Sequence, residues 1–408
     1  MKVAVVGGGL AGLAAALDLV DAGHAVAVYE ARPTLGGAVQ TLPEREGDPA
    51  GPPDNGQHIA LGCFTEYLRF LDRIGESGSY LRTRLGLPVM DENGRFATVA
   101  PSLPALLRYS HLPLRARSRL PITTLRLRSA QSRPQETFGE LLRRLGETSE
   151  SIDRFWDVFI RPALNLPADE VDAEAGLFTV RTALLGPRSN SDLILPTKPL
   201  GWMHGDAAGR VLGDRVRLER RVETLDELDA DAIVLAVPPR ESARLLGEPE
   251  PTLEDSPIVS VHLWFDQPIL DVPLAALLGT DAHWVFDRGA LLSHLPEANG
   301  QYLTVVSSGV PELLEVRGRE LVERIAAQLT ARLGEAKLLW SRVSREPYAT
   351  VALRPGVRRP GVETSRPDVA RAGSWTDTGW PATMESAIRS GRRAVQHILS
   401  TASATITA

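Results

Sequence analysis

The amino-terminal end of the chain constrains the fold more than any other part. Residues 2–6 form a β-branched run typical of a buried strand, and the chain then passes directly into a glycine-rich turn. Gly7, Gly9 and Gly12 have the G-x-G-x-x-G spacing, and a helical run and a second strand-like run ending on Glu30 follow them. In this order the glycines permit a tight turn, close approach of the backbone to a pyrophosphate and close packing of helix on strand. The sequence therefore predicts a parallel α/β unit that binds a dinucleotide.

Two further features of this stretch define what the dinucleotide site can hold. Glu30 can accept hydrogen bonds from both hydroxyls of an adenosine ribose, which favours FAD or NAD over NADP. The helix N-terminus offers free N–H groups to the phosphates, and Arg32 with Gly36 and Gly37 forms a second loop that can approach them. The alternative for Arg32 is a solvated surface position. The cofactor contacts predicted from this stretch are Gly7, Gly9, Leu10, Ala11, Gly12, Glu30, Ala31, Arg32, Gly36 and Gly37.

Composition and charge exclude several classes of protein. A net charge of -6 argues against general binding to nucleic acid. Cys63 is the only cysteine, which excludes an internal disulfide and a Cys-rich metal site, and we predict no metal. The apolar runs fall short of the roughly eighteen residues of a membrane span, and the opening strand and glycine turn differ from an export signal. We therefore expect a cytoplasmic protein.

The strand pattern indicates an α/β fold with a discontinuous first domain. Residues 215–219 alternate like a strand that Val222 continues, and residues 231–237 form a buried strand of the parallel-sheet type. The chain is therefore expected to return there to its first sheet. We predict a Rossmann-like dinucleotide domain from residues 1–70, 205–250 and 366–408, and an inserted α+β substrate domain with an antiparallel sheet and helices from residues 71–204 and 251–365.

One segment of the substrate domain has an unusual charge distribution. Residues 93–135 contain no Asp or Glu but hold several arginines among short leucine- and proline-containing pieces. A helical segment over 94–135 could lie on an anionic bilayer, with leucines in the interface and arginines at phosphates. The other interpretation is a helical substrate subdomain with a solvated basic face. Both remain open at this point.

Two polar clusters are expected to meet the reactive end of the cofactor. Asp54-Asn-Gly-Gln-His58 precedes an apolar strand-like run, and Gly56 would let the backbone pass close to a planar ligand. A turn at Asn-Gly and a core histidine are the structural alternative. Near the end, Gly373 is followed by a new helix N-terminus, which provides N–H donors for an electron-rich group. The residues predicted to contact the cofactor in these clusters are Gly56, Gln57, Gly373, Ser374, Ala382, Thr383 and Met384.

Several motifs together resemble a known superfamily. The N-terminal fingerprint, Arg221-Val222 and the ending from Gly373 to Gly391 are similar to flavin-containing amine oxidases and phytoene desaturases. Within that superfamily, the chain resembles the hydroxysqualene dehydroxylases, also called squalene-associated FAD-dependent desaturases. The motifs that carry this closer resemblance are Asp54-Asn-Gly-Gln-His58, Ala163-Leu-Asn165, Ser191-Asp-Leu-Ile-Leu-Pro196 and Trp375-Thr-Asp-Thr-Gly-Trp-Pro-Ala-Thr-Met-Glu385.

The resemblance implies an FAD-binding domain of the GR2 type, FAD as the cofactor and a cofactor contact at Val222. Because the single cysteine, Cys63, lies far from the C-terminal motif, a thioether-linked flavin is excluded and we expect non-covalent FAD. It also implies an apolar isoprenoid substrate and a reaction in squalene and hopanoid synthesis, in which hydroxysqualene and two electrons give squalene. Asp54 and His58 are the candidates for the acid that protonates the departing oxygen. The chain contains no second nucleotide fingerprint, so the electron donor is left open.

Two alternative functions differ in class. The first is a desaturase or oxidase that acts on another apolar substrate, such as a carotenoid precursor or an amine. The second is a protein of the same fold that binds a prenyl chain or lipid without catalysis. The retained glycine-rich loop and Glu30 favour the enzymatic interpretations.

Overall fold

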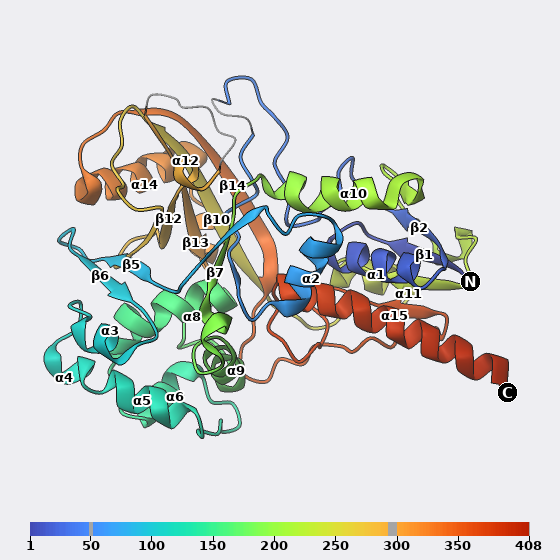
Figure 1. The fold of residues 1–408 in the computed structure, drawn as a ribbon, viewed down its shortest axis with the longest axis horizontal. Coiled ribbons are helices and arrows are strands. Elements are labelled where there is room, and N and C mark those ends of the chain that lie inside the picture. The colour runs from blue at the N-terminus through green and yellow to red at the C-terminus, as the bar shows by residue number, and fades with distance from the viewer. Residues whose placement is uncertain (49–51, 293–299, 408) are drawn as a thin grey trace.

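The computed structural model describes residues 1–48, 52–292 and 300–407. A parallel sheet with its helices forms one side of the molecule, and a large mixed sheet with a group of helices forms the other (Figure 1). Both chain termini lie on the side of the parallel sheet. The predicted α/β class, with a Rossmann-like domain and a second α+β part, is confirmed.

The first sheet contains strands from the amino-terminal unit and from two later parts of the chain, residues 216–235 and 369–371. Its five parallel strands have the order β15-β9-β1-β2-β8. They are β1 (Lys2–Val6), β2 (Ala25–Tyr29), β8 (Val216–Arg217), β9 (Ala232–Leu235) and β15 (Val369–Arg371). One face packs against α1 (Leu10–Asp21) and α15 (Met384–Thr407), and the other packs against α11 (Pro239–Leu246) and the loop around Val222. Burial of both faces explains why β1 and β9 are continuous apolar runs.

The strand β8 is much shorter than the sequence predicts. The expected strand over residues 215–222 is reduced to Val216–Arg217, because Glu219 has a φ of 54° and turns the chain out of the sheet. The N–H groups of Glu219 and Arg220 then donate to the carbonyl oxygens of Arg32 and Glu30, at 3.1 and 2.9 Å. This segment therefore braces the loop that follows β2 instead of extending the sheet.

The second sheet unites both predicted parts of the substrate domain. Its seven strands have the order β14-β10-β13-β12-β11-β5-β6, antiparallel except for the pair of β11 with β5. They are β5 (Leu87–Met90), β6 (Phe96–Val99), β10 (Asp255–Phe265), β11 (Leu274–Leu277), β12 (Trp284–Asp287), β13 (Gln301–Ser308) and β14 (Leu338–Val351). Helix α14 (Gly318–Leu333) covers one face. The prediction that residues 94–135 are helical is wrong at its start, because β6 pairs with β5 at the sheet edge.

A small third sheet and a group of helices complete the substrate side. The sheet pairs β7 (Leu193–Pro196) with β3 (Ala60–Leu61) and β4 (Tyr80–Thr83). The helices that matter below are α2 (Thr65–Arg73), α3 (Leu103–Arg108), α4 (Leu114–Arg117), α5 (Leu120–Leu127), α6 (Phe138–Arg144), α8 (Asp157–Leu164), α9 (Ala173–Ala183), α10 (Ala207–Leu212) and α12 (Arg288–Leu291). In the described residues, no helix combines the length and apolarity that crossing a membrane requires.

The closest helix packing in the first domain occurs where α15 crosses α1, and the two helices lie side by side in Figure 1. A Cβ on Gly391 would overlap the carbonyl oxygen of Ala11 and approach the backbone nitrogen of Ala15 to 3.1 Å. We expect Gly391→Ala to lower the free energy of unfolding by about 1–3 kcal/mol, because the overpacked helices must separate. Denaturant unfolding followed by circular dichroism measures this.

Gly318→Ala is the matched control, because no heavy atom lies within 4 Å of the Cβ it would add. It should leave the stability unchanged or raise it slightly, since alanine is the better helix former. Equal effects of the two substitutions would contradict the close packing of α1 on α15.

Candidate active site

The glycine-rich turn has the contacts that its spacing predicts. Gly7 has a φ of 106°, and a Cβ on Gly12 would overlap the carbonyl oxygen of Gly7. The second glycine pair lies directly against the first loop, because Gly36 donates its N–H to the carbonyl oxygen of Gly8 at 2.8 Å and forms a β-bridge with Gly9. The structure therefore brings both predicted loops together at the N-terminus of α1.

Glu30 and the start of α1 supply the polar groups of this loop. The Glu30 carboxylate accepts hydrogen bonds from the backbone N–H groups of Gly8 and Arg32, at 2.7 and 2.8 Å. Leu10 and Ala11 are buried, yet α1 has neither a side-chain cap nor an acidic residue in its first turn. Its first N–H groups are thus available to an anion. These features fit the ADP half of FAD. Ala31 and Arg32 are exposed beside them.

The segment Asp54–His58 lies between the two halves of the molecule. Asp54 forms a β-bridge with Thr41, and the Asn55 amide group donates to the carbonyl oxygen of Ala38 at 3.2 Å. On the other side, Ser344 of β14 donates to Asn55 at 2.9 Å, and a Cβ on Gly56 would come within 2.9 Å of the Ser260 hydroxyl on β10. Glycine at position 56 thus permits close contact with the second sheet.

Asp54 is held by a buried ion pair that the sequence did not reveal. Its Oδ2 accepts from Arg288 of α12 at 2.6 Å, and both side chains are at most 2% exposed. Its Oδ1 accepts from the backbone N–H of Leu200 and from the Thr41 hydroxyl, each at 2.8 Å. Arg288 also donates to the side-chain amide oxygen of Gln57, Oε1, at 2.6 Å. Both oxygens of Asp54 are occupied as acceptors, so the geometry argues against the predicted role of Asp54 as a proton donor and favours a positioning role.

His58 has a different environment from Asp54. Its side chain is only partly buried, and the described residues offer it no hydrogen-bond partner. Desolvation lowers the pKa of His58, and the negative charge of Asp54 raises it in part. An imidazole whose ring nitrogens are not engaged by other groups can exchange a proton with a ligand. His58 therefore stays the stronger candidate for the acid.

A buried tyrosine–histidine pair next to this segment was missed by the sequence analysis. The Tyr67 hydroxyl of α2 lies 2.8 Å from Nε2 of His204, and Nδ1 of His204 lies 2.8 Å from the carbonyl oxygen of Leu200. Because a carbonyl only accepts, Nδ1 carries the proton and Nε2 accepts from Tyr67. Burial lowers the pKa of His204 to about 4, and the neighbouring His58 contributes to this shift. The backbone of Leu200 thus links the two side chains. The Leu200 N–H donates to Asp54, and the Leu200 carbonyl oxygen accepts from His204.

The carboxyl-terminal motif meets the same region. Gly373 has a φ of 148° and donates its N–H to the Ser390 hydroxyl at 2.8 Å, which ties the end of β15 to α15. Glu385 accepts from the N–H of Tyr67 at 2.8 Å and so fixes the start of α2. The predicted contacts Ser374, Ala382, Thr383 and Met384 are all partly exposed around the first turn of α15. Val222, in contrast, is buried in the core on the opposite face of the first sheet, and its carbonyl oxygen accepts from Arg244 at 3.1 Å.

Several buried polar atoms at the junction have no hydrogen-bond partner among the described residues. They are Gln57 Nε2, Ser260 Oγ, His262 Nε2 and Arg288 Nε. Unpaired buried groups are rare in proteins because each one costs free energy. They lie where the 54–58 segment contacts β10 and α12, so this contact contains polar groups that the described protein atoms leave unsatisfied.

Comparison with known proteins decides the family. The family described as flavin containing amine oxidoreductase matches residues 10–399. The chain belongs to this family. FAD is therefore the cofactor of the protein, which is an FAD-dependent oxidoreductase, as predicted.

Several known proteins resemble this chain over almost its whole length. A hydroxysqualene dehydroxylase from Sinorhizobium fredii is 29% identical over 98% of this chain and 98% of its own. A zeta-carotene desaturase from Zea mays is 24% identical over 98% of this chain and 83% of its own. An oxidoreductase from Methanosarcina mazei has a similar structure, with a TM-score of 0.76 at 17% identity over 97% of this chain and 100% of that one. The last similarity supports the fold.

The ion pair of Asp54 with Arg288 should be the most sensitive polar contact of this flavoenzyme. We expect Arg288→Met to lower the free energy of unfolding by about 3–5 kcal/mol, because it leaves the Asp54 carboxylate buried without a counter-charge. The double variant Asp54→Asn/Arg288→Met should lose less than the sum of the single effects. Urea unfolding of the four proteins measures the coupling.

The control is Arg73→Met, which removes a partly exposed arginine that pairs with Asp21 through two hydrogen bonds. A partly exposed pair should contribute no more than about 1 kcal/mol. Additive effects at Asp54 and Arg288 would contradict the proposed coupling.

Buried histidines should make the folded protein sensitive to acid. Burial lowers the pKa of His204 to about 4, of His262 to about 3 and of His283 to about 4. Because each would titrate near 6.5 in the unfolded chain, the unfolded state binds more protons below about pH 6.5. The free energy of unfolding should therefore decrease as the pH falls from about 6.5 towards 4. His204→Gln should reduce this slope by up to about 1.4 kcal/mol per pH unit in unfolding curves, and an unchanged slope would be inconsistent with a neutral buried His204.

Proposed function

We propose that the protein catalyses reductive dehydroxylation of a squalenoid, most specifically the conversion of hydroxysqualene to squalene in squalene and hopanoid synthesis. The observation that carries this proposal is the match with the hydroxysqualene dehydroxylase from Sinorhizobium fredii, which extends over 98% of both chains. The chemistry of the site is compatible with this reaction.

The reaction breaks one C–O bond and forms one C–H bond. Hydroxysqualene takes up one hydride and one proton, and the products are squalene and water. FAD, when bound in its reduced form, supplies the hydride. The chain itself must supply a proton to the departing oxygen, exclude water from the reacting carbon and bind a long apolar substrate.

His58 is the residue we propose as the proton donor. It is partly exposed and lies in the segment that the ion pair of Asp54 with Arg288 fixes in place. Its neighbours compete less for the role, because the Tyr67 hydroxyl already donates to His204 and Asp54 accepts with both oxygens. Burial lowers the pKa of His58, so its protonated form is a stronger acid than an ordinary imidazolium.

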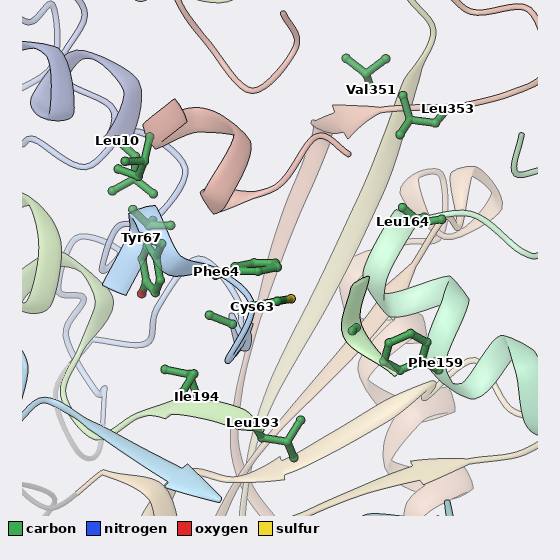
Figure 2. Packing of buried hydrophobic residues seen from close by; sticks show 14 of the residues in the cluster. Leu10, Cys63, Phe64, Tyr67, Phe159, Leu164, Leu193, Ile194, Val351 and Leu353 are labelled. Atoms are coloured by element: carbon green, nitrogen blue, oxygen red, sulfur yellow. The ribbon is translucent and has the colours of Figure 1, made fainter. Parts of the chain in front are cut away.

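Apolar and aromatic side chains surround this region on the substrate side. Figure 2 shows Phe64 and Cys63 at the start of α2 facing Leu193 of β7 and Phe159 of α8 across the cluster. Trp380 contacts Phe64 and Phe178 edge to face, with ring centroids 6.0 and 5.1 Å apart. Such an environment suits an isoprenoid chain, and aromatic faces stabilise positive charge that develops on carbon.

The substrate class also bears on where the protein works. A squalenoid is almost insoluble in water, so we infer that the enzyme takes it up at the inner face of a membrane in the cytoplasm. The electron donor that reduces the flavin would be a separate molecule, because the chain has one nucleotide fingerprint.

Reaction of the reduced holoenzyme tests the proposal. The purified protein with bound FAD is reduced with dithionite under anaerobic conditions and mixed with hydroxysqualene. We expect flavin reoxidation and an equal amount of squalene, measured by absorbance and gas chromatography. His58→Gln should bind FAD with the same spectrum but react at least about a hundredfold more slowly, because it lacks the acid. His24→Gln, which replaces a histidine in the turn between α1 and β2, serves as the control and should react at the rate of the unmodified protein.

Other outcomes would identify the alternative functions. A holoenzyme that forms no squalene but is reduced, in its oxidised form, by a carotenoid precursor would be a desaturase, as the relative from Zea mays is named. Full activity of His58→Gln would transfer the acid role to another group.

A further inference from the structure

The three short helices α3, α4 and α5 form a surface with exposed apolar side chains, which we call the α3–α5 surface. The exposed apolar residues are Leu103, Leu107, Leu114, Ile122 and Leu125, with exposed fractions of 57, 45, 76, 50 and 63%. The three helices pack on one another and lie together at the end of the molecule away from the first sheet (Figure 1). Apolar exposure on this scale, concentrated on neighbouring helices, marks an interaction surface.

The helices already use their other sides for the protein core. Leu106, Ala116, Leu120 and Leu127 are buried in the main apolar cluster, while the leucines named above point outward. In α3, Leu103 and Leu107 are four residues apart and share a face, as do Ile122 and Leu125 of α5. A helix that is apolar on two sides needs a second apolar neighbour.

The arginines of this surface lack acidic partners. Residues 93–135 contain no Asp or Glu, and no ion pair of the described residues involves an arginine from 95 to 133. Arg108, Arg115 and Arg128 are exposed next to the apolar side chains. Arginines just outside the segment behave differently, since Arg143 pairs with Asp169 and Arg154 with Glu92. The surface is therefore complementary to a partner that offers both an apolar region for the leucines and negative charges for the arginines.

We propose that the α3–α5 surface binds the membrane interface, with its leucines among the acyl chains and its arginines at the phosphates of anionic lipids. An amphipathic surface of this kind lies in the plane of the bilayer. The main apolar cluster is continuous from the underside of α3 and α5 to Phe159, Phe64 and Tyr67 near the site. The inference deepens the proposed function by naming the surface through which an apolar substrate would arrive, but lipid binding itself needs no substrate.

Vesicle sedimentation of the full-length holoenzyme tests the proposal. We expect binding to vesicles that contain phosphatidylglycerol, weaker binding to pure phosphatidylcholine, and a loss of binding as salt increases. Arg108→Gln/Arg115→Gln/Arg128→Gln should lower the partition coefficient at least about tenfold, since each arginine near an anionic membrane surface adds to the attraction. Leu107→Ser/Leu125→Ser should weaken binding to both kinds of vesicle.

Matched variants control for charge and apolar exposure in general. Arg240→Gln/Arg317→Gln/Arg319→Gln removes three exposed arginines elsewhere, and Leu218→Ser/Leu339→Ser removes two leucines that are 44 and 55% exposed. Both should bind vesicles like the unmodified protein, and thermal unfolding checks that all variants fold.

Three results would overturn the proposal. They are absence of binding to either vesicle, equal loss in the control variants, and a concentration-dependent oligomer that Leu107→Ser/Leu125→Ser dissociates. The last result would make the surface an interface between copies of the chain. Because sedimentation does not depend on turnover, a failed dehydroxylation assay with normal vesicle binding would contradict only the proposed reaction.

Discussion

The ion pair between Arg288 and Asp54 is the interaction on which the site depends. Burying two opposite charges is costly unless close geometry and further hydrogen bonds compensate for lost hydration. Here the compensation is complete at Asp54, which accepts from Arg288, Leu200 and Thr41. These three partners come from the substrate side, from the segment before α10 and from the loop after Gly37. One carboxylate therefore fixes three separate parts of the chain relative to one another.

The positions of the other polar groups follow from this arrangement. Leu200 is held by Asp54 through its N–H and holds His204 through its carbonyl, which sets the tautomer of His204 and orients the Tyr67 hydroxyl. His204 and Tyr67 are buried and uncharged at neutral pH, so Asp54 is the charged group that acts on the pKa of His58. In such surroundings a single proton has a large electrostatic effect. That is the setting in which an acid can assist the loss of hydroxide from an apolar substrate.

The fold and the proposed substrate are consistent in their distribution of charge. Towards the first sheet, the chain presents glycine turns, Glu30 and a free helix N-terminus, which suit a charged nucleotide. Towards α3 and α5 it presents a continuous apolar cluster and then leucines and arginines at the surface. The groups that suit the cofactor and those that suit the proposed substrate thus lie on different sides of the molecule.

The sequence alone determined the parts of the protein that depend on local contacts. The strands β1 and β2, the helix α1 and the order of Gly7, Gly9, Gly12 and Glu30 were all predicted, because a tight turn and helix–strand packing leave a periodic pattern within thirty residues. The family followed from the same pattern and from the motifs at the other end of the chain.

The tertiary structure decided everything that depends on distant partners. Arg288 lies 234 residues from Asp54, and no motif surrounds it, so its role emerged only when the second sheet placed it beside the loop. The same holds for Tyr67 and His204, which are 137 residues apart, and for β6, whose edge position depends on pairing with β5. The physical reason is that a buried charge or a strand edge is specified by whichever group lies opposite in space, and sequence periodicity records only neighbours along the chain.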